Sequence, residues 1–277
     1  MQRRRGRAPL YTSDEEVAGL KTAAKFNSQL LDFLRGHVRE GISTLELDKL
    51  AATYTQDHGH KPACLGYGGT PTRPPYPNVI CTSVNHVVCH GIPNDTPLKD
   101  GDIVNVDLTT IVDGWHGDQS ETFMIGNVSA AAQRLVQTTF DSMWKGIRAC
   151  MVNGRMWAVG NAIQQHALNA GFSVVQEYQG HGIGRMFHQD PDVPHFPTPA
   201  SNRVVLKPGM CFTIEPMLNQ LGYKTKTDKD DRWTVYTEDG CLSAQFEHMV
   251  LMTEDGPEIL TLTEKGPREG DTITPVT

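Results

Sequence analysis

The chain has 277 residues, of which 38% are hydrophobic and 21% charged, and its formal net charge is −7. This length and composition allow a sizeable buried core and exclude disordered and fibrous proteins. No stretch approaches the roughly twenty apolar residues that cross a bilayer, and no apolar segment follows the basic start MQRRRGRAPL, as it would in a signal peptide. We therefore expect a globular cytoplasmic protein without membrane association.

The cysteines and the charge exclude two further classes of protein. Six cysteines are scattered along the chain without a CxxC pair, which indicates reduced thiols rather than a disulfide framework or a zinc finger. The negative net charge argues against a protein that binds specific nucleic acids. The local exception is Arg3, Arg4, Arg5 and Arg7, for which a mobile, solvated tail is favoured over an RNA-binding arm.

The first half of the chain predicts two helices and then strands. Ser13 and Glu16 form a capping-box pattern, and apolar residues at helical spacing follow as far as Leu34. A second helix is expected from about Thr44. The proline-rich segment TPTRPPYPN then predicts an extended, stiff loop. From residue 79 to residue 125 the pattern is typical of strands, with a hairpin in the middle.

The second half repeats this order of elements. Helices are expected at residues 130–152 and 156–170, and strands at 204–206, 210–217, 234–237 and 243–252. We predict a single α+β domain of two related halves over residues 13–263. Residues 1–12 are expected to form a flexible basic tail, and residues 264–277 a loose C-terminal tail with little to bury.

The predicted hairpin carries two aspartates on one face. Asp113-Gly114 is a strong signal for a two-residue turn, and folding about it places Asp118 opposite Thr109, on the same face as Asp107. The two carboxylates then become diagonal neighbours with Cβ atoms about 7 Å apart, a separation that suits the binding of cations. Because acidic residues on an exposed strand are often simply solvated, the pair alone leaves both interpretations open.

A histidine loop and two glutamates favour the metal interpretation. The loop GHGIGRMFH carries His181 and His188, and its GxGxG spacing does not match the dinucleotide-binding fingerprint. Glu215 in FTIEPM and Glu247 in SAQFEHMVLM lie in apolar, strand-like runs that contain no lysine or arginine. Buried carboxylates need a cation as partner. With the two aspartates they make a set of hard oxygen donors that suits divalent ions and is a poor match to structural zinc.

The segment HVVCH admits a rival interpretation as a zinc-binding helix, with His86 and His90 one turn apart. Val87 and Val88 favour a strand instead, and the glutamate of an HExxH motif is absent. We therefore place His90, beside Gly91, at the site.

With these residues the chain resembles the type I methionine aminopeptidases, members of the pita-bread metallohydrolases. The order and spacing match from about Ser13 to Leu262. The resemblance implies an α+β pita-bread fold, in which an antiparallel sheet carries helices on its outer face and the two halves are pseudo-symmetric. The matching segments are ACLGY (63–67), SVNHVVCHGIP (83–93), DGDIVNVDL with DGWHGDQS (100–120), GHGIGRMFH (180–188), GMCFTIEPM (209–217) and SAQFEHMV (243–250).

The resemblance also implies an activity, which is removal of the N-terminal methionine from peptides and nascent chains with a small second residue. Two divalent metal ions are implied, drawn from Co, Mn, Fe, Zn and Ni. Asp107 is expected to bind one ion, Asp118 and Glu247 to bridge both, and His181 and Glu215 to bind the other. Glu215 is also expected to take the proton of the attacking water.

Substrate contacts are implied in the same way. His90 and His188 are expected to flank the scissile amide, and both are candidate catalytic residues. A monomer is expected, and a contact between the arginine-rich tail and the ribosome is left open. The implied walls of the methionine pocket are Cys64, Tyr67, Tyr76, Cys81, Phe187 and Trp233.

The chain departs from the family pattern at two places. Residues 70–75 are inserted beside the pocket, and Gln119 stands where a threonine is common and is expected to affect the hydrogen bonding of Asp118. Two alternatives are an X-Pro aminopeptidase-like hydrolase and a non-catalytic pita-bread module that binds peptides. The short stretch before His90 argues against the first, and the complete ligand set argues against the second.

Overall fold

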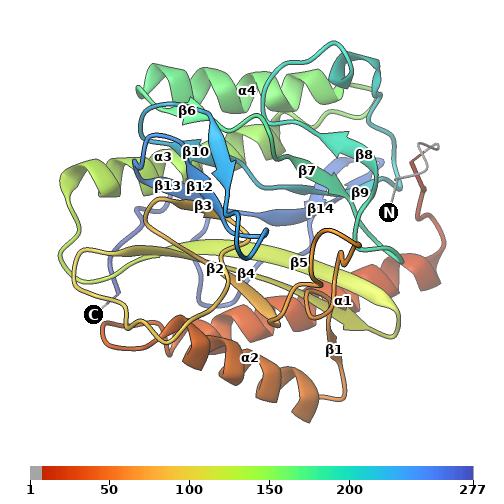
Figure 1. The fold of residues 1–277 in the computed structure, drawn as a ribbon. Helices are drawn as coiled ribbons and strands as arrows, with labels where there is room; N and C mark the ends of the chain where they lie inside the picture. Colours follow the sequence, from red (N-terminus) through yellow and green to blue (C-terminus); the bar gives the residue numbers. More distant parts are fainter. Residues whose placement is uncertain (1–7, 277) are drawn as a thin grey trace.

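The computed structural model describes residues 8–276, in which four α-helices enclose antiparallel sheets (Figure 1). In this view α2 lies below the long β4–β5 hairpin and α4 lies above the strands of the second half, while α1 packs against the hairpin and α3 packs against α4 and β13. The helices are α1 (Asp14–Arg35), α2 (Thr44–Asp57), α3 (Ala130–Arg148) and α4 (Met156–Asn169). The strands of the first half are β1 (Lys61–Pro62), β2 (Ile80–Val84), β3 (Val87–Cys89), β4 (Ile103–Val112) and β5 (Trp115–Met124). Those of the second half are β6 (Ser173–Val174), β7 (Gly180–Gly182), β8 (Gln189–Val193), β9 (Cys211–Ile214), β10 (Met217–Asn219), β11 (Thr225–Thr227), β12 (Val235–Thr237), β13 (Ser243–Gln245), β14 (His248–Thr253) and β15 (Gly256–Ile259).

The strands form four small sheets. Their orders are β1-β4-β2 with β5 beside β4, β13-β10-β6, β11-β12-β3 and β15-β14-β9-β7-β8. Every pairing between these strands is antiparallel. One apolar cluster packs α3 and α4 on the second half, and another packs α1 and α2 on β2, β4 and β5. The predicted α+β class and its two rounds of helices and strands are confirmed.

The helices begin where the sequence predicts. At α1 the Ser13 hydroxyl accepts from the Glu16 amide and the Glu16 carboxylate accepts from the Ser13 amide, as in the predicted capping box. Ser43 and Glu46 form a second capping box at α2. Gly171, with φ at +85°, follows the end of α4.

Three predicted strands differ from the observed ones. Residues 204–206 form only an isolated bridge, between Val205 and Arg155. The expected strand 210–217 is interrupted after Ile214, since Pro216 has no amide hydrogen for a ladder. The expected strand 243–252 is interrupted before His248, because the Glu247 amide donates instead to the Ser120 carbonyl of β5, 3.0 Å away. Both glutamates of the candidate site therefore lie in gaps between strands.

Both ends of the described chain pack more closely than the predicted tails. Tyr11 is 6% exposed, and its amide donates to the Gly209 carbonyl. At the other end, Val276 pairs with Ile125 through a bridge, and the Ile273 amide donates to Gln137 of α3. No described residue from 264 to 276 is buried, but these hydrogen bonds tie the end of the segment to β5 and α3. Residues 1–7, and with them the four arginines, lie outside the described residues.

Within residues 8–276, no helix combines the length and the apolar content needed to cross a bilayer.

A partly buried ion pair joins α1 to β5. The Arg35 guanidinium binds both carboxylate oxygens of Glu121, at 2.5 and 2.7 Å, and the two side chains are 17% and 9% exposed. We expect Arg35→Met to lower the free energy of unfolding by about 3 kcal/mol, because it leaves the Glu121 carboxylate buried without its partner. Urea unfolding of the metal-loaded protein measures this loss. The double variant Arg35→Met/Glu121→Met should recover part of it, and a loss below about 0.5 kcal/mol in the single variant would contradict the assigned role.

Candidate metal centre and active site

The β4–β5 hairpin has the predicted register. Asp118 pairs with Thr109, and Asp107 pairs with Ser120, so the two aspartates are diagonal neighbours on one face. The turn at Asp113-Gly114 has positive φ at both residues, as its type requires. The predicted hairpin and its diagonal pair are confirmed.

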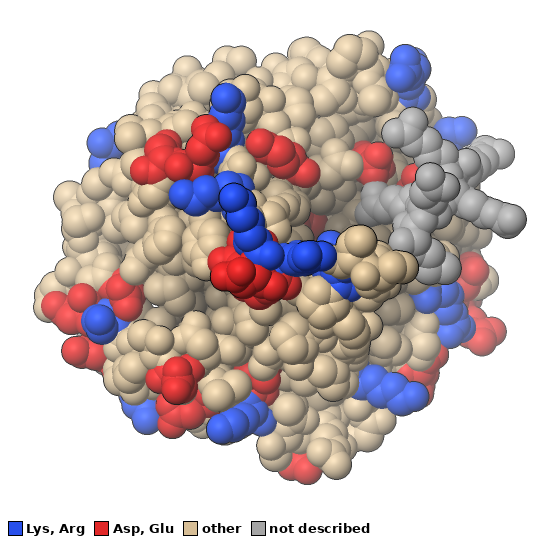
Figure 2. Space-filling model, viewed as in Figure 1, with Lys and Arg blue, Asp and Glu red and all other residues tan. Residues whose placement is uncertain are grey.

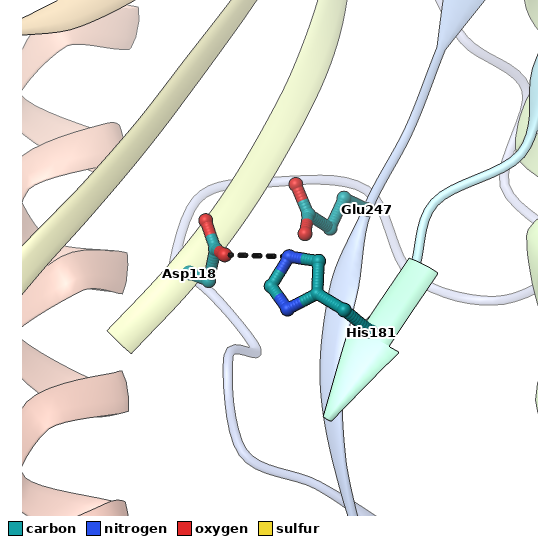
Figure 3. A group of neighbouring side chains, drawn as sticks. All are labelled: Asp118, His181 and Glu247. Atoms are coloured by element: carbon teal, nitrogen blue, oxygen red, sulfur yellow. Dashed lines mark ion pairs between the residues drawn. The ribbon is translucent and has the colours of Figure 1, made fainter. Parts of the chain in front are cut away.

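Three side chains converge between the two halves of the domain (Figure 3). Asp118 comes from β5, His181 from β7, and Glu247 from the gap between β13 and β14. Their side chains point toward one another, and one ligand atom from each lies within 4.8 Å of the others. All three are buried, which separates them from ordinary solvated acidic groups.

The other two predicted ligands lie beside this cluster. His181 Nε2 is 3.6 Å from both Asp118 Oδ2 and Glu215 Oε1. Asp107 lies on β4 and lines the same cavity. His181 Nδ1 lies 3.1 Å from the Gly182 carbonyl oxygen, and a hydrogen bond there places the proton on Nδ1. That tautomer leaves the Nε2 lone pair directed at the carboxylates, as a metal-binding imidazole requires.

The buried carboxylates of the cluster need a cation to balance their charge. Burial raises the pKa of Asp107 to about 7. Burial and the charge of Asp107 raise the pKa of Asp118, and burial with the charges of Asp118 and Glu215 raises the pKa of Glu247. Within residues 8–276, no lysine or arginine forms an ion pair with Asp107, Asp118 or Glu247. Hard oxygen donors in this arrangement fit divalent metal ions.

A cavity of about 280 Å³ opens beside the cluster, and every residue predicted for the site lines it. Tyr76 and Trp233, 3% and 5% exposed, meet edge to face at 5.3 Å. The Tyr76 hydroxyl donates to the Gly91 carbonyl at 2.9 Å, which anchors this wall to the segment beside His90. The predicted pocket residues are Cys64, Tyr67, Tyr76, Cys81, Phe187 and Trp233, which together make an apolar surface containing two thiols.

His90 and His188 face this cavity from different elements. His90 follows β3, with φ at +56°, and burial lowers its pKa to about 4, so the imidazole is neutral at pH 7. His188 Nδ1 lies 2.7 Å from the Tyr67 hydroxyl, and the two rings stack at 5.1 Å. The structure thus brings both predicted histidines to the site, whereas His86 stacks on Tyr236 instead.

Several polar residues at the site escaped the sequence-based prediction. The Thr109 hydroxyl donates to Asp118 Oδ1 at 2.7 Å, and the Thr213 hydroxyl donates to Glu215 Oε1 at 2.7 Å. Gln245 Nε2 donates to Glu215 Oε2 at 3.3 Å. Thr109 and Thr213 each lie two positions from a predicted ligand, and the two-residue strand period is the signal that identifies them.

The Gln119 side chain does not take part in the hydrogen bonding of Asp118, although the sequence predicted such an effect. Its carboxamide oxygen accepts from the Ser28 hydroxyl of α1 at 3.1 Å. Because neighbouring residues of a strand point to opposite faces, this side chain is directed away from Asp118. Of Gln119 itself, only the backbone amide acts on the Asp118 carboxylate, where its hydrogen bond offsets part of the rise in pKa that burial causes.

Comparison with known proteins decides the family. The model of metallopeptidase family M24 matches residues 18–254. The chain belongs to metallopeptidase family M24. It is 45% identical over 261 residues to the methionine aminopeptidase of Escherichia coli K12, which covers 94% of both chains.

Solved structures agree with this family. The crystal structure of methionine aminopeptidase from Rickettsia prowazekii is similar, with a TM-score of 0.86, 44% identity, and coverage of 92% of this chain and 100% of that one. An Xaa-Pro dipeptidase from Bacillus anthracis has a TM-score of 0.72 at 20% identity, covers 94% of this chain and 63% of its own, and shows the shared fold alone. The expected pita-bread fold is thereby confirmed.

Proposed function

We propose that this M24 protein is a metal-dependent aminopeptidase that removes the N-terminal methionine from peptides and nascent chains with a small second residue. The observation that carries the proposal is the apolar, thiol-containing pocket beside the buried Asp118–His181–Glu247 cluster. A flexible thioether fits such a surface well. The names of the relatives at about 45% identity support the same activity.

The metal centre would be held by the five predicted ligands. Asp107 would bind one divalent ion, His181 and Glu215 the other, and Asp118 and Glu247 both. When bound, the two ions supply Lewis-acid activation of water and of the scissile carbonyl. Four carboxylates and one imidazole suit divalent Co, Mn, Fe, Zn or Ni.

Glu215, His188 and His90 would transfer protons and orient the substrate. Glu215, oriented by Thr213 and Gln245, would accept the proton of the attacking water. His188 would donate a hydrogen bond to the developing oxyanion from Nε2 while the Tyr67 hydroxyl holds its Nδ1. His90, kept neutral because desolvation and the charge of Arg73 lower its pKa, would contact the scissile nitrogen.

Cleavage of short peptides, with metal analysis of the same sample, tests this function. We expect hydrolysis of Met-Ala-Ser, weak hydrolysis of methionyl peptides with a bulky second residue, and no cleavage of Ala-Pro-Ala. A chelator should abolish turnover, and added divalent ions should restore it. Preferential cleavage of Ala-Pro-Ala would favour the X-Pro alternative. Binding of methionyl peptides without turnover in the metal-loaded protein would favour a non-catalytic module.

We also propose that the protein acts in the cytoplasm as a monomer. The site is assembled from residues of a single chain, which supports a monomer. The finding that no described helix could cross a bilayer is compatible with the cytoplasm. Size-exclusion chromatography with light scattering and cell fractionation test these two proposals.

A further inference from the structure

The inserted segment 70–75 contributes one charged residue to the candidate active site. Arg73 lines the cavity, and it is the only lysine or arginine among the described residues that do so. The other charged lining residues are acidic: the four carboxylates of the metal cluster and Glu177. The Glu177 carboxylate accepts from the Thr225 amide at 3.4 Å, and within residues 8–276 no ion pair joins it to Arg73.

The Arg73 guanidinium is held in place by two kinds of contact. Its centre lies 4.0 Å from the ring centroid of Trp233, a short cation–π contact. Nε and Nη2 donate to the Gly68 carbonyl, at 3.3 and 3.0 Å. The Trp233 indole in turn donates to the Pro74 carbonyl at 2.9 Å, so the inserted segment and the pocket wall support each other. The cation is therefore positioned before any peptide binds, which lowers the ordering entropy that binding costs.

Part of the donor capacity of Arg73 remains available. A guanidinium has five N–H groups, and the hydrogen bonds described above account for two of them. Arg73 is half-buried at the cavity wall, where a charge is less screened than on open surface. Basic side chains also cross the middle of this face of the molecule, near the position of the β12 label in Figure 1, but acidic side chains lie among them there (Figure 2). Arg73 differs from them in lining the cavity itself.

We propose that Arg73 is a specificity-determining residue that favours substrates with a carboxylate just beyond the small second residue. The inference rests on the proposed methionyl aminopeptidase activity. If methionine occupies the Cys64–Trp233 pocket, the chain after the scissile bond leaves along the cavity wall at roughly 3.3 Å per residue. An acidic side chain at the third residue can then reach the planar guanidinium, which suits a carboxylate better than an ammonium does.

Amidated tetrapeptides test this inference, because they carry no terminal carboxylate that could also bind Arg73. We expect the metal-loaded wild-type protein to cleave Met-Ala-Glu-Ser-amide with a kcat/KM roughly three- to fivefold above that of Met-Ala-Gln-Ser-amide at low salt. Arg73→Gln should bring this ratio to about one, and Arg73→Lys should retain part of it. The wild-type ratio should also fall as salt is added.

Arg232→Gln is the matched control. It removes a neighbouring cation whose guanidinium binds the Thr72 carbonyl, but which does not line the cavity. This variant should keep the wild-type ratio. A wild-type ratio near one, or an Arg73→Gln variant that slows both peptides equally, would overturn the inference and leave Arg73 as a support for Trp233. Failure of the wild-type protein to cleave either peptide would instead overturn the proposed function.

Discussion

Asp118→Asn is expected to abolish peptide hydrolysis, with a loss of at least roughly a thousandfold in kcat/KM. The Asp118 carboxylate belongs to the buried cluster with His181 and Glu247 and lies opposite Thr109 in the hairpin. The amide removes a negative charge and weakens one oxygen donor while keeping nearly the same volume, so the fold should persist.

Metal ions should stabilise Asp118→Asn against thermal unfolding less than they stabilise the wild-type protein. The wild-type protein should gain stability when divalent metal ions are added, because they bind the folded state and relieve repulsion among buried carboxylates. Asp118→Asn should lose most of this gain, and its metal-free form should be no less stable than the metal-free wild type. Thermal unfolding with a chelator and with metal measures both effects. Full turnover by the reconstituted variant would exclude the proposed centre.

His188→Ala is expected to lower kcat by roughly a hundred- to a thousandfold while metal content stays at the wild-type level. His188 faces the cavity with Nδ1 bound to the Tyr67 hydroxyl, and it is assigned to the developing oxyanion rather than to the metal ions. Tyr67→Phe removes only the orienting hydroxyl, so its effect on kcat should be smaller and of the same kind.

His181→Ala is the matched comparison for His188→Ala. Its Nε2 lies 3.6 Å from two carboxylates of the cluster, so this substitution should weaken metal binding first. Activity should then recover in part at high metal concentration. Metal analysis after dialysis, together with kcat at saturating metal, separates the two variants. Equal loss of metal from both would show that the two histidines of GHGIGRMFH do not have separate roles.

Local sequence determined the elements that have local causes. The capping residues Ser13 and Ser43 specify the start of α1 and α2, because a side chain three residues away satisfies the free amides. The Asp113-Gly114 turn specifies the register of β4 with β5, since a two-residue loop allows one pairing. The positions of Asp107 and Asp118 on one face follow from that register alone.

Only the tertiary structure decided how the rest of the site is assembled. Glu247 reaches Asp118 because its amide pairs with Ser120, 127 residues earlier in the chain (247 − 120), and no local pattern encodes that contact. The position of the C-terminal segment has the same kind of cause, because its hydrogen bonds go to the distant Met124 carbonyl and the Gln137 side chain. Arg73 lies in the proline-rich segment 70–75, and its position depends on the Trp233 ring, which is 160 residues away (233 − 73). Such contacts form when surfaces that are distant in the sequence pack together and exclude water. The residue types therefore predict the chemistry of the site. The packing of the whole domain decides the geometry of the site.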